Sequence, residues 1–416
     1  MKNFLKNYKS SLILLAAILL GGIIGAIMGP DAAKLEPFGQ IFLNLMFVII
    51  VPLVFFSVAS SIANMGGMKR LGKIMRNVVI TFLVTSVIAG VLSIAGALVF
   101  QPTEGLDTNE IESILSLSDE EAEEAVILTL PQQLVKTITV NDFYGLLSRS
   151  NMLQLIVFSL IFGIATALVG EKAASVKTLL GAASEVLMKM IHIIMYYAPI
   201  GLGCYFAAVV GQLGPQILEG YLRVFLLYIG LSLIYYFGFY SLYAFVAGGK
   251  EGFKAFWKQI IAPSVTALAT CSSAATIPVN LEATKKIGVP TDIADTVIPL
   301  GTNTHKDGSV IGGVLKIVFL FGLFGRDMTS LSSLLSILAV GFLVGAVMGA
   351  IPGGGMIGEL LILSVYGFQP ELLPIIAVIS TIIDAPATVL NATGNTASAM
   401  LVARFTDGKL GKKLSN

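Results

Sequence analysis

The chain has 416 residues, of which 56% are hydrophobic and 12% are charged. Soluble domains carry about 25% charged residues, so this composition excludes an ordinary water-soluble globule. Apolar stretches of about 20 residues recur along the chain, each long enough to cross a hydrocarbon core about 30 Å thick. The sequence therefore predicts an all-α polytopic membrane protein. Its net charge of +1 gives no reason to expect nucleic acid, which needs a basic face.

Six plain apolar spans are expected before residue 250. The first follows Lys2, Lys6 and Lys9, but its flank lacks a good cleavage site. We therefore interpret it as a retained helix and not as a signal peptide. The predicted spans are 11–28, 38–65, 78–100, 152–169, 178–210 and 223–246.

Charged residues between the spans set the orientation. Lysine and arginine cluster in the amino-terminal tail and again at 69–76, which places both segments in the cytoplasm by the positive-inside rule. The segment 104–124 is rich in Asp and Glu and is expected outside. We interpret it as an exposed, solubilising loop and not as a cation-attracting site. The pattern predicts a multi-pass protein of the cell membrane with both termini in the cytoplasm.

Two later segments do not resemble plain spans. The segment of about 251–290 is only partly apolar and is broken by Ser272 and Ser273. The segment of about 330–369 is broken by the Pro-Gly-Gly-Gly run 352–355. We expect each to form a re-entrant helical hairpin, whose non-helical tip a membrane tolerates where protein or water covers it. A helix interrupted by polar residues should follow each hairpin. Because the hairpins enter from opposite sides, the two units form inverted repeats, which is typical of transporter binding sites.

Three ionisable side chains, Lys306, Asp307 and Asp384, are expected at bilayer depth. A charge at the bilayer centre costs about 2.5–3.5 kcal/mol on insertion scales, so such residues are usually paired and functional. One interpretation is a salt bridge of Lys306 with Asp384 or Asp307 that joins two helices. We favour the other, a substrate and cation site, because the same regions carry hydroxyl and amide side chains and both hairpin tips.

The polar side chains near these charges suit a zwitterionic ligand. Ser272 and Ser273 offer hydroxyls and half-helix amide groups to a carboxylate. Asp384 is the natural partner for a substrate ammonium group. Thr388 and Asn391 follow Asp384 by four and seven residues, so all three share one helical face.

Two further features are less specific. The glycines 353–355 permit close backbone approach and suit a gate that moves. His305 fits a proton relay, a ligand partner or a hydrogen-bonded packing residue, and the sequence leaves all three open. With no second His or Cys at ligand spacing, a transition-metal site is not expected.

Four ordered motifs make the chain recognisable. They read Cys-Ser-Ser-Ala-Ala-Thr-Ile-Pro-Val-Asn at 271–280, Lys-Asp-Gly-Ser at 306–309, Ile-Pro-Gly-Gly-Gly at 351–355 and Asn-Ala-Thr-Gly-Asn at 391–395. Together they resemble the glutamate transporter family, the dicarboxylate/amino acid:cation symporters, over nearly the whole chain.

The resemblance implies a homotrimer that works by an elevator mechanism. Each protomer should have eight transmembrane helices and two re-entrant hairpins. A scaffold is implied for residues 1–75 and 101–215, and a mobile transport domain for residues 76–100 and 216–416. The second hairpin should gate the site.

The resemblance also implies which residues bind. For the substrate it implies Ser273, Ser309, Asp384, Thr388 and Asn391. Together with the tip residues chosen above, the predicted substrate site is Ser272, Ser273, Ser309, Ile351, Gly353, Gly355, Asp384, Thr388 and Asn391. Ser273 and Ser309 match binders of the substrate carboxylate. Asp384 and Thr388 match binders of its amino group. The cation site, or what has replaced it, maps to Thr85, Ser86, His305, Lys306, Asp307 and Asn395.

The sequence departs from the family pattern at several of these positions. The family's Asn-Met-Asp-Gly-Thr motif reads His-Lys-Asp-Gly-Ser at 305–309. Members that take acidic substrates have an arginine at the position of Ala387, and the carboxylates usual at Ser380 and Asn395 are missing. These changes shift the local charge by about three units, which weakens the attraction for sodium ions at low dielectric.

We therefore hypothesise a secondary active transporter for a small neutral amino acid, in which Lys306 occupies or screens the former cation site. Sodium coupling is then weakened, lost or replaced by protons, with weak Na⁺ binding at Asp307 left open. The alternative is a Na⁺-coupled symporter of glutamate, aspartate or C4-dicarboxylates. An intramembrane hydrolase using Ser273 or His305 lacks a nucleophile-base signature, so we expect no enzyme and no cofactor.

Overall fold

A computed structural model of the chain describes residues 2–63, 69–103, 139–148, 151–194, 196–213, 216–348, 354–369 and 372–408. All regular secondary structure in these ranges is helical. The first half contains α1 (Lys2–Met28), α2 (Glu36–Ala63), α3 (Lys69–Phe100), α6 (Met152–Val169), α7 (Ala174–Ile194) and α8 (Ala198–Leu213). The second half contains α9 (Gln216–Leu233), α10 (Tyr240–Gln259), α11 (Ile261–Thr270), α12 (Ser273–Lys286), α13 (Thr291–Thr304), α14 (Asp307–Leu323), α15 (Leu331–Val347), α16 (Gly354–Tyr366) and α17 (Leu373–Asp407).

Helical stretches in the described ranges are long and apolar enough to cross a membrane, judged by length and composition. They are Ala16–Phe42, Gly72–Phe100, Val157–Leu187, Ile217–Leu268 and Leu373–Asp407. Together with their helical structure, they confirm the predicted all-α, multi-span class. The acidic segment 104–124 lies outside the described residues.

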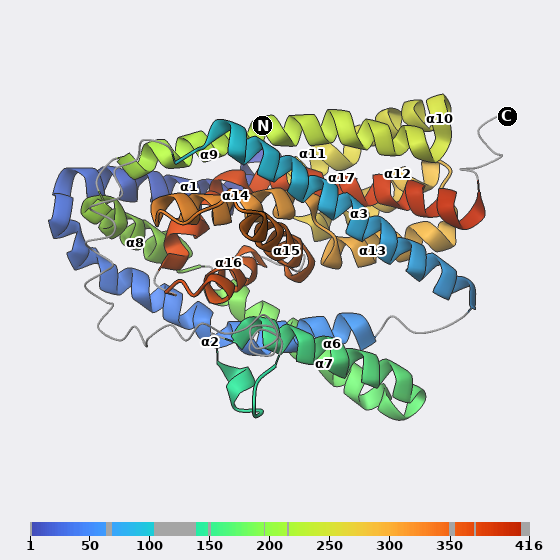
Figure 1. Ribbon diagram of the computed structural model, residues 1–416, viewed down its shortest axis with the longest axis horizontal. Coiled ribbons are helices and arrows are strands. Elements are labelled where there is room, and N and C mark those ends of the chain that lie inside the picture. The colour runs from blue at the N-terminus through green and yellow to red at the C-terminus, as the bar shows by residue number, and fades with distance from the viewer. Residues whose placement is uncertain are drawn as a thin grey trace.

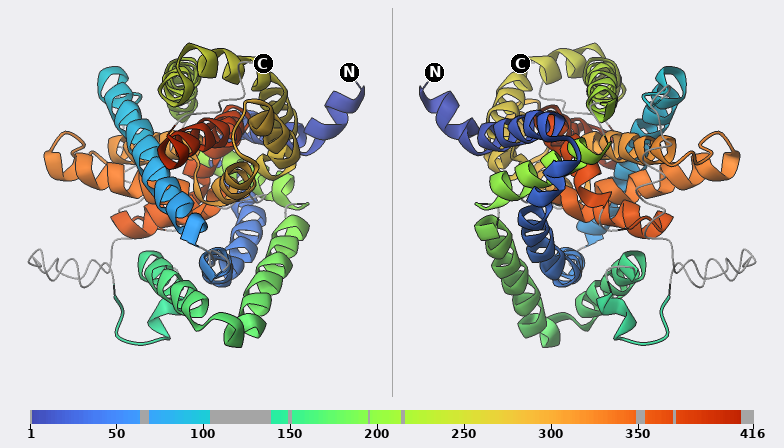
Figure 2. Two further views of the ribbon diagram at one scale, coloured as in Figure 1. Left: turned by 90° about the vertical axis from the view of Figure 1, so that its right-hand side faces the viewer. Right: turned by 90° about the vertical axis from the view of Figure 1, so that its left-hand side faces the viewer.

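The helices pack in two sets. Helices α1, α2, α6, α7 and α8 pack mainly against one another, and α6 and α7 lie below the rest of the bundle in both views of Figure 2. In the second set, α17 is central and packs against α3, α9, α10, α11, α12, α13, α14 and α16. Figure 1 shows α17 running along the middle of the molecule, with α3 crossing in front of it.

One predicted span is two helices. Residues 178–210 were expected to form one span, but α7 ends at Ile194 and α8 begins at Ala198. Pro199 explains the break, because proline lacks an N–H and cannot continue the hydrogen-bond pattern of a helix that precedes it. Proline is tolerated in the first turn of a helix, which is where Pro199 lies in α8.

The first hairpin turns where the sequence places it. Helix α11 ends at Thr270, Cys271 has a left-handed backbone with φ of 47°, and Ser272 is the amino-terminal cap of α12. The Ser272 Oγ accepts a hydrogen bond from the Ala275 amide at 3.2 Å. Helices α15 and α16 also pack against each other. Ile351 and Gly353, predicted at the tip between them, lie outside the described residues.

Only the first of the two expected interrupted helices is interrupted. His305 and Lys306 separate α13 from α14 with extended backbone, and the break comes before Asp307 and not at Gly308. The prediction for the second is wrong, because α17 continues from Leu373 to Asp407.

The side chains of Thr393 and Asn395 bond back to carbonyls of α17 and leave the helix intact. Thr393 Oγ1 donates to the Val389 carbonyl at 2.6 Å, and Asn395 Nδ2 donates to the Asn391 carbonyl at 2.8 Å. The Thr393 hydroxyl and the Asn395 amide group therefore donate to carbonyls within a regular helix.

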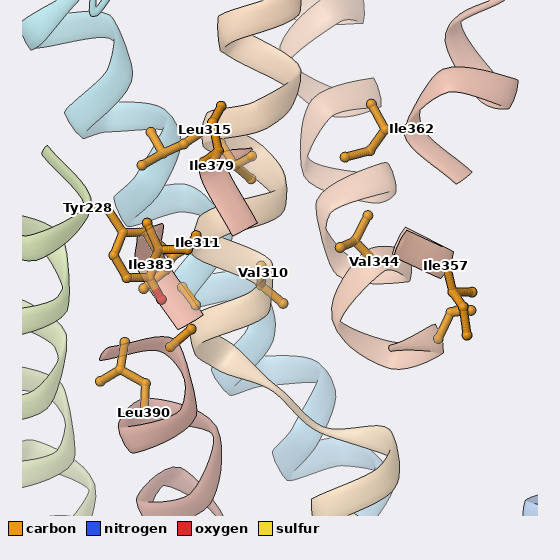
Figure 3. Close-up of a cluster of buried hydrophobic side chains, with 14 of the residues drawn as sticks. Tyr228, Val310, Ile311, Leu315, Val344, Ile357, Ile362, Ile379, Ile383 and Leu390 are labelled. Carbon is orange, nitrogen blue, oxygen red and sulfur yellow. The ribbon is translucent and has the colours of Figure 1, made fainter. Parts of the chain in front are cut away.

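An apolar core joins α9, α14, α16 and α17. Figure 3 shows part of it, including Tyr228, Ile311, Ile383 and Leu390. All four are buried, and Tyr228 donates a hydrogen bond from its hydroxyl to the Gly308 carbonyl at 3.0 Å. This core fixes the first turn of α14, where the candidate site begins.

Candidate functional site

His305 lies at the centre of a buried polar cluster. Its Nε2 is 2.7 Å from the Thr85 Oγ1 and 3.0 Å from the Asp307 Oδ1, and its Nδ1 is 3.0 Å from the Asn395 Oδ1. Its ring stacks on Phe82 with a centroid separation of 4.2 Å. Both ring nitrogens therefore have polar partners, and the imidazole joins α3, α14 and α17.

The extended backbone at the break explains which side chain enters this cluster. Successive side chains of an extended chain point to opposite faces, and residues two apart share a face. His305 and Asp307 accordingly meet each other, while Lys306 between them points elsewhere. The sequence analysis assigns both His305 and Lys306 to the cation site, and the side chain that contacts Thr85 and Asp307 is that of His305.

Asp307 retains some capacity to bind a donor or a cation. Ser86 Oγ donates to its Oδ1 at 3.4 Å. Its Oδ2 is buried and has no hydrogen-bond partner among the residues that the structure describes. A sodium ion bound by Thr85 and both Asp307 oxygens would have to displace the His305 ring. The present arrangement of oxygen atoms therefore does not fit such an ion.

Asn391 and Ser309 form a second polar contact between α17 and α14. The Ser309 amide donates to the Asn391 Oδ1 at 3.1 Å, and the Asn391 Nδ2 donates to the Ser309 Oγ at 3.0 Å. The two side chains are buried. The structure thus brings together these two residues, which the sequence predicts in the substrate site.

Asp384 is the exposed acidic residue of this region. It lies on α17 one turn before the buried Thr388, as predicted from their spacing. The buried Lys306 interacts electrostatically with Asp384. An exposed carboxylate with a buried ammonium nearby can bind a cationic group of a ligand while its own charge is partly balanced.

The first hairpin approaches α17 in parallel register. The Asn280 Nδ2 donates to the Ala392 carbonyl at 2.5 Å, and four residues further along both helices the hydroxyls of Thr284 and Thr396 are 3.0 Å apart. Seven residues before this contact, counted from Asn280 in α12 and from Ala392 in α17, Ser273 is level with residue 385. The amino-terminal end of α12 is therefore level with Asp384.

The structure also contains a buried ion pair that the sequence analysis missed. Lys316 Nζ of α14 lies 3.0 Å from Glu359 Oε1 of α16, and both side chains are almost completely buried. Both residues interrupt apolar runs, so the rule that selected Lys306 and Asp384 from the sequence would also have found them.

Glycine at the second tip lies beside this pair. A Cβ atom on Gly355 would be 3.3 Å from Ser380 Oγ and 3.7 Å from Glu359 Oε1. Gly355 is a described residue of the predicted tip, and it places the start of α16 against Ser380, one turn before Asp384.

Comparison with known proteins agrees with this architecture. The model of the Sodium:dicarboxylate symporter family matches residues 11–405. The chain belongs to this family. It is a multi-pass membrane protein of a symporter family and not an enzyme, which confirms the resemblance found in the four motifs.

Several relatives are similar along almost their whole length. The proton/sodium-glutamate symport protein of Bacillus caldotenax is 29% identical over 401 residues, covering 93% of this chain and 92% of the relative. The proton/glutamate-aspartate symporter of Escherichia coli (strain K12) is 26% identical over 418 residues, covering 96% and 94%. The C4-dicarboxylate transport protein of Rhizobium etli is 28% identical over 398 residues, covering 94% and 88%.

Proposed function

We propose that this symporter carries a small neutral amino acid and that its sodium coupling is weakened or lost. The observation on which the substrate proposal depends is the exposed Asp384 carboxylate, level with the amino-terminal end of α12. A carboxylate can hold a substrate ammonium group, and the free amides at a helix amino terminus can hold a substrate carboxylate. The two ends of a zwitterion therefore have complementary partners.

The position of Ala387 supports a substrate without an acidic side chain. It lies three residues after Asp384 on α17 and offers no cation at the position where the family pattern for acidic substrates has an arginine. Ser272, Ser273, Thr388 and Asn391 supply neutral hydroxyl and amide groups. Such groups suit the backbone of an amino acid and leave the side chain without a fixed counter-charge.

The His305 cluster supports the proposal on coupling. The imidazole already engages the Thr85 hydroxyl and one oxygen of Asp307, which are the oxygen atoms that a hard cation needs. In this proposal the imidazole of His305, and not the ammonium group of Lys306, occupies the place of the sodium ion. Lys306 instead balances part of the Asp384 charge.

The packing of the helices supports an elevator mechanism. Helices α1, α2, α6, α7 and α8 form one set, as a scaffold requires, and α3 and α9 to α17 form the other, as a transport domain requires. We propose that α15 and α16 form the gate, that three protomers associate through the scaffold, and that both termini are cytoplasmic.

A second candidate is symport of glutamate, aspartate or a C4-dicarboxylate with a cation. The names of the relatives, which are glutamate, aspartate and C4-dicarboxylate transporters, favour it, and so does the positive charge of Lys306 close to Asp384. The carboxylate of Asp384 disfavours a dicarboxylate that lacks an amino group, because two like charges would then meet in the site.

Transport by the purified protein in liposomes tests the proposal. Radiolabelled L-alanine, L-serine, L-glutamate and succinate should each be offered in sodium and in choline buffer, with and without an inward proton gradient. We expect uptake of a neutral amino acid that does not require sodium. Uptake that depends strongly on sodium, or uptake of glutamate or succinate alone, would contradict the proposal and favour the second candidate.

A further inference from the structure

Three helices of the second set meet at a buried cluster of two charges and a hydroxyl. Lys316 on α14 donates to Glu359 on α16 at 3.0 Å and also to the Ser380 hydroxyl on α17. Ser380 in turn donates to the same Glu359 oxygen, Oε1. The surroundings are apolar, since Leu315, Ile357 and Ile379, which flank the cluster in sequence, belong to the buried core (Figure 3).

The Glu359 carboxylate is only half satisfied. Its Oε2 is buried and has no hydrogen-bond partner in the described part of the chain, whereas Oε1 accepts two hydrogen bonds. A purely structural polar network inside a membrane protein is expected to be fully bonded, because an unpaired buried polar atom is costly. A role for the charge itself explains better why this carboxylate is present.

The cluster lies next to the candidate substrate site. Ser380 precedes Asp384 by one turn of α17, and Gly355 at the start of α16 packs on Ser380 and Glu359. Lys316 interacts electrostatically with Asp384. A ligand held by Asp384 therefore experiences the charge of Lys316, whose ion-pair partner is Glu359.

The formal charges of Lys306, Lys316, Asp384 and Glu359 cancel, and Asp307, the other buried acid nearby, contacts His305 at 3.0 Å. Lys306 and Lys316 contribute two positive charges, and Asp384 and Glu359 contribute two negative charges. A neutral amino acid leaves this sum at zero, whereas aspartate or glutamate adds one negative charge. At low dielectric an uncompensated charge is unfavourable, so the balance selects against acidic side chains.

We propose that the Lys316–Glu359 pair sets the preferred charge of the substrate side chain. Glu359 cancels the charge of Lys316 and thereby excludes acidic substrates. The inference rests on the proposed function, since it concerns the substrate class of the same site. It predicts that removing the charge of Glu359 shifts the substrate preference toward acidic amino acids. Removing the charge of Lys316 should shift that preference the other way.

Ligand binding to the purified full-length protein tests this assignment. The probes are L-asparagine and L-aspartate, which have the same size and differ by one charge, together with a panel of glycine, L-alanine, L-serine and L-glutamine. Glu359→Gln should improve aspartate affinity relative to the best neutral ligand by at least about ten-fold. Lys316→Gln should lower the ratio of aspartate affinity to neutral-ligand affinity, or make aspartate binding undetectable.

The double variant Lys316→Gln/Glu359→Gln is the matched control. It loses the same hydrogen bonds as the single variants but keeps the charge sum at zero. Its preference should stay within about three-fold of the wild-type protein. An unchanged ratio in a folded Glu359→Gln protein, or the same change in the double variant, would overturn the proposal.

A second pair of variants keeps the proposal testable if the single charge removals do not fold. Ser380 is partly exposed, so Ser380→Lys can add a positive charge at the same place, with Ser380→Gln as the neutral control of similar length. Only the lysine variant should gain aspartate affinity. Equal effects of both would overturn the assignment, whereas failure of the wild-type protein to bind any neutral amino acid would contradict the proposed function.

Discussion

Asn391 binds Ser309 through both ends of its amide group. Its Oδ1 accepts from the Ser309 amide at 3.1 Å while its Nδ2 donates to the Ser309 hydroxyl at 3.0 Å. The Ser309 amide is in the first turn of α14, where backbone N–H groups have no partner within the helix. Asn391 of α17 thus caps α14, and one side chain connects the two helices on which the candidate site is built.

This capping predicts unequal effects of two substitutions. Asn391→Leu leaves the Ser309 amide and hydroxyl buried without a partner and should lower the free energy of unfolding by about 1–3 kcal/mol. Ser309→Ala removes only the hydroxyl bond and should cost about 0.5–1.5 kcal/mol. Thermal melting in detergent measures both. Equal loss of stability in the two variants would contradict the capping role.

Asp384→Asn should abolish much of the substrate affinity without unfolding the protein. The substitution replaces a charge-assisted hydrogen bond to the ligand ammonium with a neutral one, which costs about 1.5–3 kcal/mol or roughly ten-fold to a hundred-fold in Kd. Asp31→Asn is the matched control, because Asp31 is exposed and pairs only locally with Lys34 at 2.7 Å. Binding of the neutral amino acid identified in liposomes is the measurement, and equal affinities in both variants would exclude Asp384 as the ammonium partner.

The sequence predicts the helical membrane class and the turn at Ser272 because both depend on local chemistry. Long apolar runs need a membrane, and a serine after a left-handed residue caps the next helix whatever surrounds it. The uninterrupted α17 could not be predicted in the same way. Its polar residues resemble those of a broken helix, and only the structure shows that Thr393 and Asn395 bond within one turn.

The orientation of side chains at the break is also a tertiary property. The sequence places His305, Lys306 and Asp307 at one position in the membrane, but which of them meets Thr85 depends on where α13 ends. A break after Thr304 puts His305 and Asp307 on one face.

The sequence could show that Lys316 and Glu359 are charged residues within apolar runs. It could not show that they form a pair, because they lie far apart in the chain.

The loop after α14 predicts a pH-dependent contribution to stability. Hydrogen bonds from the Thr329 hydroxyl at 2.6 Å and the Thr329 amide at 2.8 Å, with help from Ser330, lower the pKa of Asp327 to about 2. A lowered folded-state pKa stabilises the protein above the unfolded value of 3.8, and the contribution is lost as pH falls toward 2. The difference in Tm between the wild-type protein and Asp327→Asn should therefore be constant near neutral pH and shrink in this acidic range. A difference that grows on acidification would contradict this prediction.

Gly394→Ala should destabilise the contact between α10 and α17. A Cβ atom at this position would lie 2.4 Å from the Tyr240 hydroxyl and 3.3 Å from the Asp307 Oδ2. Overpacking of this kind costs about 1–3 kcal/mol, whereas Gly230→Ala, with nothing within 4 Å, should be neutral or stabilising. Tyr240→Phe removes the clashing oxygen and should recover part of the Tm lost in Gly394→Ala. No recovery in the double variant would show that the loss has another cause.

His305→Asn should make substrate binding sensitive to sodium. The shorter side chain frees the Thr85 hydroxyl and the Asp307 Oδ1 from the imidazole and adds an amide oxygen, so that hard-cation ligands become available in one place. If sodium binds only the ligand-competent form, linkage should raise substrate affinity by at least about five-fold in the variant, while the wild-type affinity should be the same in sodium and in choline. Lys306→Met is the matched comparison, because it removes a neighbouring cation but leaves the imidazole in place, and its response should be smaller. A larger sodium response in Lys306→Met than in His305→Asn would contradict this assignment. It would indicate that Lys306, and not His305, occupies the place of the sodium ion.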